Sequence, residues 1–195
     1  MRKAVFVLIF VSLVGCARPP MNNYGDNSDT TTRGGVFTTE VEASDFGEKL
    51  GEFGTDLKNA KKARAHNIAL AASKIDGSVV EPGEVFSYNE AVGPTTKNNG
   101  FKLGMIFIGG EKSEGYGGGV CQVSSTLFNA ADKAGMEIVE RHDHSRPVGY
   151  VEVGRDAATS YGVIDFKFKN TKEHAVEINA YVKDERIVCE IYKKG

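Results

Sequence analysis

A cluster of glycines directly before a cysteine and a helical pattern is the feature that most restricts how this chain folds. The stretch reads GYGGGVCQVSSTLFNAADKAG, from Gly115 to Gly135. Gly135 stands where a left-handed cap would end a helix. The apolar residues before it recur at helical spacing, at Val120, Val123, Leu127, Ala130, Ala131 and Ala134. The pattern therefore predicts a helix with Cys121 in its first turn.

A thiol in a first helical turn has an electrostatic advantage as a nucleophile. The positive end of the helix dipole and the unpaired amide groups there favour the thiolate and lower the pKa of Cys121. Gly117, Gly118 and Gly119 permit backbone conformations closed to other residues and leave the approach to the sulfur free of side chains. The alternatives are a buried, inert cysteine or a disulfide with Cys189, because thiols of exported proteins tend to pair.

A nucleophilic cysteine needs a base and a group that orients the base. The segment ERHDHSRPVGYVEVGRDA supplies His142 and His144, which point to the same side if the segment is extended, and Asp156 a short way on. The same cysteine, histidines and aspartate are also a plausible zinc set. Their spacing matches no closed zinc motif, so we expect no metal and no cofactor.

The N-terminus has the pattern of an export signal. MRKAVFVLIFVSLVGC begins with two basic residues and continues in an apolar run, Ala4 to Val14, that is too short to span a bilayer. Its last four residues, LVGC, match the bacterial lipobox. We therefore expect residues 1–15 to be a lipoprotein signal peptide and Cys16 to carry the lipid that anchors the protein to a bacterial membrane outside the cytoplasm. An ordinary signal peptide cut elsewhere is the alternative.

The next segment predicts a tether before one folded domain. Residues 17–35 are polar and nearly free of aliphatic side chains, so they cannot form a core. We expect a flexible tether over residues 16–35 and a folded domain over residues 36–195. The net charge of the chain is only -2, which disfavours binding to nucleic acid.

The remaining patterns predict an α+β fold. Helical spacing from Leu57 to Ile75 predicts a second main helix, and short apolar runs predict strands at Val85–Tyr88 and Met105–Ile108. Period-two alternation follows in GVIDFKFKN, HAVEINAYV and RIVCEIYKK, where Cys189 points to the core. We expect these three stretches to form an antiparallel three-stranded meander in a single domain with two main helices.

Three long stretches resemble the VanW domain. They are HNIALAASKIDGSVVEPGEVFSYNEAVGPTTKNNGF, GGGVCQVSSTLFNAADKAGMEIVERHDHSRPVGYVEVGRDA and YGVIDFKFKN, and the resemblance covers roughly residues 57 to 195. The family pattern carries a cysteine at a glycine-led helix start, a histidine-serine pair and a Gly-Arg-Asp. Here these are Cys121, His144-Ser145 and Gly154-Arg155-Asp156. Ser125 stands where threonine is common.

The resemblance implies an extracytoplasmic protein linked to the bacterial cell wall. The VanW domain was first noted beside glycopeptide-resistance genes and has no settled reaction. A second likeness, at the level of architecture, is to papain-like cell-wall endopeptidases of the NlpC type, because their cysteine also opens a helix. Fold alone does not settle function.

Two hypotheses follow for the function. In the first, Cys121 is a nucleophile that acts on an amide or acyl bond of peptidoglycan, His144 is its base, and Asp156 or His142 orients the base. Gln122 would donate to an oxyanion, and Arg155 would pair with a substrate carboxylate or with Asp156. In the second, the protein binds peptidoglycan or muropeptides without catalysis, or serves envelope assembly. Under either hypothesis, the residues expected to contact the substrate are Gly118, Gly119, Gln122, Ser124 and Arg155.

Overall fold

The computed structural model describes residues 47–195, apart from 59, 109 and 110. The helices in this part of the chain are α1 (Lys62–Ile75), α2 (Tyr88–Val92) and α3 (Val120–Lys133). The strands are β1 (Lys49–Asp56), β2 (Val79–Val80), β3 (Val85–Ser87), β4 (Leu103–Ile108), β5 (Glu111–Tyr116), β6 (Glu137–Glu140), β7 (Lys167–Lys169), β8 (Val176–Lys183) and β9 (Arg186–Lys193).

The largest sheet has four antiparallel strands in the order β1-β9-β8-β2. Its centre is the hairpin of β8 and β9, which pair along their full length. Two residues join them, Asp184 and Glu185, and both have positive φ angles, 49° and 55°. A two-residue turn of this kind matches the twist of the strands that it joins, so it fixes their register.

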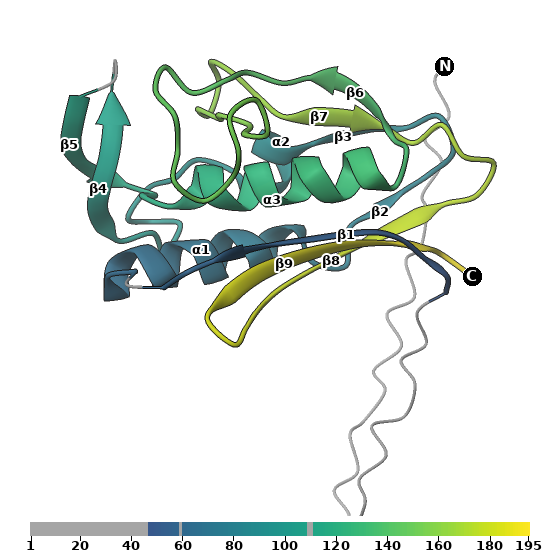
Figure 1. The fold of residues 1–195 in the computed structure, drawn as a ribbon, viewed down its shortest axis with the longest axis horizontal. Helices are drawn as coiled ribbons and strands as arrows, with labels where there is room; N and C mark the ends of the chain where they lie inside the picture. Colours follow the sequence, from purple (N-terminus) through teal and green to yellow (C-terminus); the bar gives the residue numbers. More distant parts are fainter. Residues whose placement is uncertain (1–46, 59, 109–110) are drawn as a thin grey trace, which may run out of the picture. The chain divides into compact units, whose positions relative to one another are not determined.

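Helix α3 lies between this sheet and a second sheet of order β3-β7-β6 (Figure 1). On one side α3 contacts β1 and β9, and α1 covers β8. On the other side the ring of Phe128 meets Phe166 edge to face, with the ring centroids 5.8 Å apart. Because α3 is covered on both sides, it is buried almost along its whole length. The β4–β5 hairpin forms a separate two-stranded sheet.

The α+β class, the antiparallel sheets and the two main helices are confirmed, with one correction to the C-terminal meander. Strands β8 and β9 pair as expected, but β7 joins the other sheet, between β3 and β6. The reason lies in the connection after β7. The side chain of Asn170 is fully buried and donates to the carbonyl oxygens of Val80 and His174, both at 2.9 Å, which fixes a turn from one sheet to the other.

Several predictions fall outside the described residues. The signal peptide, the lipidated Cys16, the tether and the domain start at residue 36 all lie within residues 1–46. In the part of the chain that is described, no helix combines the length and the hydrophobicity required to span a membrane.

Candidate active site

Helix α3 starts at Val120, which places Cys121 in its first turn as predicted. Gly119 caps the helix with a φ of 110°. A Cβ atom on Gly119 would lie 2.8 Å from Cγ1 of Ile68 in α1, and one on Gly118 would lie 2.5 Å from the carbonyl oxygen of Met105 in β4. The glycines therefore allow the helix start to dock closely against α1 and β4. Gly118 is buried, so it does not offer the open approach to the sulfur that the sequence suggested.

Cys121, His144 and Asp156 come together at this helix start. Cys121 is a free, partly exposed thiol, and it donates to the carbonyl oxygen of Thr159 at 3.4 Å. Nδ1 of His144 lies 2.5 Å from Oδ2 of Asp156, and the backbone N–H of His144 donates to the same oxygen at 2.7 Å. Asp156 is 7% exposed. The carboxylate thus fixes the imidazole, and Cys121 and His144 each shift the pKa of the other.

The charges of this group favour an ionised cysteine. Burial raises the pKa of the Cys121 thiol, but the hydrogen bond with His144 and hydrogen bonds with Thr159 outweigh burial, and the net pKa is lowered. The hydrogen bond with Cys121 raises the pKa of His144; burial opposes this, and Asp156 adds to it. Both shifts favour a thiolate beside an imidazolium, which is the reactive form of a cysteine nucleophile.

Helix α3 itself positions the loop that carries Asp156. Oγ of Ser125 accepts the backbone N–H of Ala157 at 2.9 Å. Nδ2 of Asn129 donates to the carbonyl oxygen of Arg155 at 2.7 Å. Asp156 stands between these two attachment points. The helix that carries the thiol therefore also fixes the carboxylate, and through the carboxylate the imidazole.

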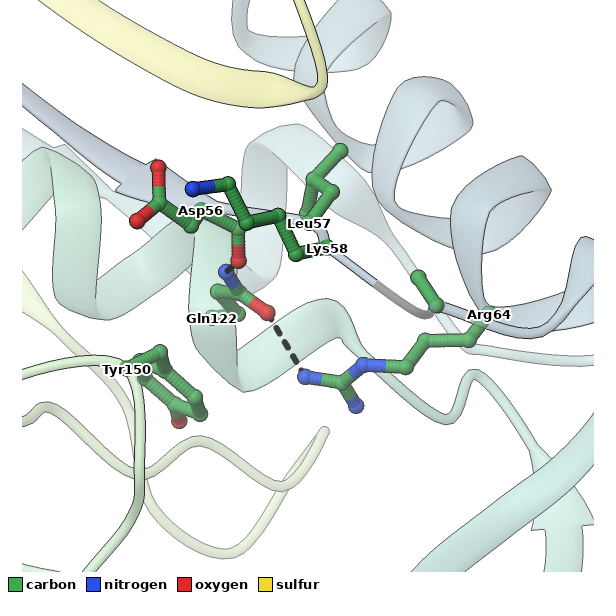
Figure 2. A pocket seen from close by; sticks show the side chains of 7 residues that line it. Asp56, Leu57, Lys58, Arg64, Gln122 and Tyr150 are labelled. Atoms are coloured by element: carbon green, nitrogen blue, oxygen red, sulfur yellow. Dashed lines mark hydrogen bonds between the residues drawn. The ribbon is translucent and has the colours of Figure 1, made fainter.

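A pocket of about 200 Å³ lies beside the first turn of α3 (Figure 2). Its lining includes Asp56, Arg64, Gln122 and Tyr150. Arg64 and Tyr150 approach Gln122 from two sides, and Arg64 donates to Oε1 of Gln122 at 2.7 Å. Gln122 directly follows Cys121 in the chain, so the pocket lies beside the helical turn that carries the thiol.

The family of the chain follows from comparison with known proteins. A family model described as "VanW like protein" matches residues 63–192, which is more than half of the chain. The chain belongs to the VanW-like family.

Two curated relatives of this VanW-like chain are informative. "Uncharacterized protein YoaR" of Bacillus subtilis (strain 168) is 50% identical over 133 residues, which cover 68% of this chain and 44% of the relative. "Vancomycin B-type resistance protein VanW" of Enterococcus faecalis (strain ATCC 700802 / V583) is 30% identical over 134 residues, which cover 66% and 49%. The chain spans about half the length of both relatives. No solved structure matches it, so the papain-like layout stays a prediction.

The VanW-like site uses only one of the two neighbouring histidines. Nε2 of His142 lies 3.1 Å from Oε1 of Glu140, and 43% of the His142 side chain is exposed. His142 therefore has a carboxylate partner of its own, whereas His144 bonds to Asp156 and interacts with the thiol. The disulfide alternative is wrong, since Cys121 and Cys189 are both free. Cys189 is fully buried, and burial raises the pKa of its thiol.

Three of the residues expected to contact the substrate have hydrogen-bond partners within the protein. Gln122 is 2% exposed and donates to Oγ1 of Thr55 and to the carbonyl oxygen of Asp56, both at 2.9 Å. Ser124 is fully buried and donates to the carbonyl oxygen of Ala157 at 2.6 Å. Arg155 donates from Nε to Oδ1 of Asn129 at 2.7 Å. These hydrogen bonds position the site, and Gln122 also lines the pocket.

Three residues that the sequence analysis missed complete the VanW-like site. Thr159 contacts the thiol, Tyr150 lines the pocket, and Arg141 donates from Nε to the carbonyl oxygen of Asp156 at 2.6 Å. Arg141 directly precedes the histidine pair, so its position was a usable signal, whereas nothing in the sequence pattern marks Thr159. Among the residues that the structure describes, no group of three or more His, Cys, Asp or Glu side chains is arranged to hold a metal ion.

Proposed function

We propose that this VanW-like protein is a cysteine-dependent enzyme that cleaves or transfers an amide-linked acyl group of peptidoglycan in the bacterial envelope. The observation that carries the proposal is the order of the three side chains. The Cys121 thiol interacts with the side chain of His144, and Nδ1 of that side chain lies 2.5 Å from Oδ2 of Asp156. A nucleophile, a base and a group that orients the base are the minimum for covalent acyl chemistry.

The reaction divides into two steps. The Cys121 thiolate attacks the carbonyl carbon of the amide, the C–N bond breaks, and the His144 imidazolium gives its proton to the leaving amine. His144, now neutral, takes a proton from water, which attacks the thioester carbon and releases Cys121 and a carboxylic acid. An amine in place of water gives transfer instead of hydrolysis. Asp156 keeps the ring oriented and stabilises its positive charge throughout.

The envelope setting and the substrate are part of the proposal. The relative from Enterococcus faecalis is named a vancomycin resistance protein, and the lipobox-like LVGC before residue 17 is consistent with anchoring through Cys16 outside the cytoplasm. Stem peptides of peptidoglycan offer amide bonds in that compartment. A protein tethered to the membrane surface by acyl chains at Cys16 would reach them without any nucleic-acid or cofactor partner.

Incubation of the full chain with purified muropeptides tests this function. Mass spectrometry is expected to detect an acyl adduct on Cys121 and altered muropeptides with the wild type, and neither with Cys121→Ala. His142→Asn is the matched control, since its imidazole lies outside the group and its loss is expected to leave turnover in place. Wild-type protein that binds the fragments but leaves them unaltered would instead assign a noncatalytic wall-binding or assembly role.

A further inference from the structure

The pocket beside Cys121 contains positive charge without a matching carboxylate. Arg64 and Lys58 both line it. The acidic residue of the lining, Asp56, pairs instead with Nε of Arg186 at 3.2 Å. Within residues 47–195 as described, no carboxylate lies in ion-pair distance of Arg64 or Lys58. The guanidinium of Arg64 gives a hydrogen bond to Gln122 at 2.7 Å, and its other N–H groups are available to a ligand.

Tyr150 interacts electrostatically with both the positive charge of the pocket and the thiol. It lines the pocket together with Arg64, and the charges of Arg64 and Cys121 both affect its pKa. Burial raises the pKa of Tyr150 and the thiolate of Cys121 raises it further, against the opposing effects of a hydrogen bond with Ser125 and of the Arg64 charge. The phenol therefore keeps its proton and remains a hydrogen-bond donor. A ligand in the pocket would meet a guanidinium and a phenol, next to the nucleophile.

We propose that this pocket binds the terminal α-carboxylate of a peptide through Arg64 and Tyr150. The carboxylate geometry suits a guanidinium, which can give two parallel hydrogen bonds. The volume of about 200 Å³ equals that of about seven water molecules in the liquid, which limits the bound residue to a small one. This inference rests on the proposed function, because it names which amide the cysteine attacks.

The consequence is a choice of bond. A small C-terminal residue held by its carboxylate in the pocket places its own amide bond toward Cys121. The thiolate attacks the carbonyl carbon of the preceding residue, and the C–N bond to the terminal residue breaks. The terminal amino acid leaves with the proton from His144. The protein would thus remove or replace the last residue of a peptide and would not cut within the chain.

Binding to a form without the nucleophile tests the pocket apart from the chemistry. The full chain carrying Cys121→Ala is titrated with a tripeptide whose C-terminal alanine has a free carboxylate, and separately with the same tripeptide as its C-terminal carboxamide. NMR measures the affinity of each. The free acid is expected to bind about tenfold to a hundredfold more tightly, as for hydrogen bonds to a charged group. Adding Arg64→Met is expected to remove this preference, and Arg64→Lys to restore part of it.

Lys62→Met is the matched control, because it removes the same charge from the same helix outside the pocket lining. The preference for the acid should survive it. Equal affinity for acid and amide, no binding of either peptide, or a preference that persists in Arg64→Met would each overturn the pocket assignment. Inorganic phosphate is titrated in parallel, and Arg64-dependent binding of phosphate without binding of the acid would also overturn it. If the wild type leaves muropeptides unaltered but the Cys121→Ala form still prefers the free acid over the amide, only the enzymatic proposal is rejected.

Discussion

At the scale of single residues, the lowered pKa of Cys121 makes a direct prediction about reactivity. The rate of alkylation of Cys121 by iodoacetamide should rise with pH through a midpoint below that of an ordinary thiol, about 8.5. The reason is that the interactions with His144 and Thr159 together outweigh the effect of burial. Mass spectrometry of the labelled peptide measures the rate at each pH. Cys189 is the internal control, because it is fully buried and should stay unlabelled in folded protein.

The two pKa shifts of this pair also set the pH window in which it is charged. The thiolate exists above the lowered pKa of Cys121 and is lost as the pH falls through that value. The imidazolium exists below the raised pKa of His144 and is lost as the pH rises through it. The ion pair therefore has its highest population between the two values. A midpoint at or above that of a free thiol would contradict the arrangement.

Asp156→Asn tests whether the carboxylate supports the charge on His144. Without the negative charge the pKa of His144 should fall, since Asp156 raises it. The imidazolium then stabilises the thiolate less, and the alkylation midpoint of Cys121 should move to higher pH. His142→Asn is the control and should leave the midpoint in place, because His142 contacts Glu140. Equal shifts of the alkylation midpoint in Asp156→Asn and His142→Asn would mean that Asp156 has no specific effect on the charge of His144.

The sequence could predict this site only in part. Helical spacing predicts the position of Cys121, but the alternation places His142 and His144 on the same side and leaves open whether Asp156 or His142 orients the base. The choice between them depends on Glu140, which engages His142 and is held by Lys167 at 2.9 Å across the pairing of β6 and β7. That hydrogen bond with Lys167, followed by one from the backbone N–H of Asp165, lowers the pKa of Glu140 to about 2. Such a contact arises from the tertiary fold and has no local pattern.

At the scale of elements, the junction of α3 with the loop at Ala157 should contribute measurably to stability. Ser125→Ala removes the acceptor of the Ala157 N–H, which bonds at 2.9 Å in a fully buried site. An unsatisfied buried donor costs about 1–3 kcal/mol, and urea unfolding should show a loss of that size. Ser73→Ala is the control, because its exposed hydroxyl bonds only to the preceding turn. Its expected effect is within about 0.5 kcal/mol.

Gly119 makes a second prediction for the same helix. A Cβ atom there would lie 2.8 Å from Ile68, and the φ of 110° disfavours any side chain. Gly119→Ala should therefore reduce the free energy of unfolding by about 1–2 kcal/mol or more. Gly104→Ala is matched to it, since Gly104 has no positive φ and a Cβ atom there would have no neighbouring atom within 4 Å. Equal stability of the two variants in thermal unfolding would contradict the close docking of α3.

The elements themselves were predicted unevenly, for identifiable reasons. Both main helices have regular apolar spacing, and α1 ends at Ile75 as predicted. It starts at Lys62 and not at Leu57, because the backbone N–H of Leu57 donates to the carbonyl oxygen of Glu185 at 2.7 Å and so still belongs to the sheet region that follows β1. Strand β1 gave no signal, since its inward positions include Gly51 and Thr55 in place of aliphatic residues. Gly51 lets the backbone of α3 approach closely, and Thr55 bonds to Thr126 of that helix at 2.9 Å.

At the scale of the whole molecule, β1 belongs to the main sheet although it lies outside the residues that the family model matches. The match covers residues 63–192, yet the edge of the main sheet is β1, at Lys49–Asp56. It pairs with β9 and covers α3. Through Thr55 and Asp56 it also holds Gln122, the neighbour of Cys121. The candidate active site therefore depends on a strand that lies outside the matched region.

A pair of shortened chains tests this dependence. Residues 47–195 should unfold cooperatively, whereas residues 57–195 should lose cooperative unfolding and bind a hydrophobic dye. Removal of β1 uncovers the edge of β9 and one side of α3. It also removes both hydrogen-bond acceptors of Gln122 and the Thr55 partner of Thr126. Calorimetry measures the transition of each chain. If residues 57–195 unfolded at the same temperature as residues 47–195 and kept the alkylation midpoint of Cys121, β1 would be an addition to the domain and not a part of its core.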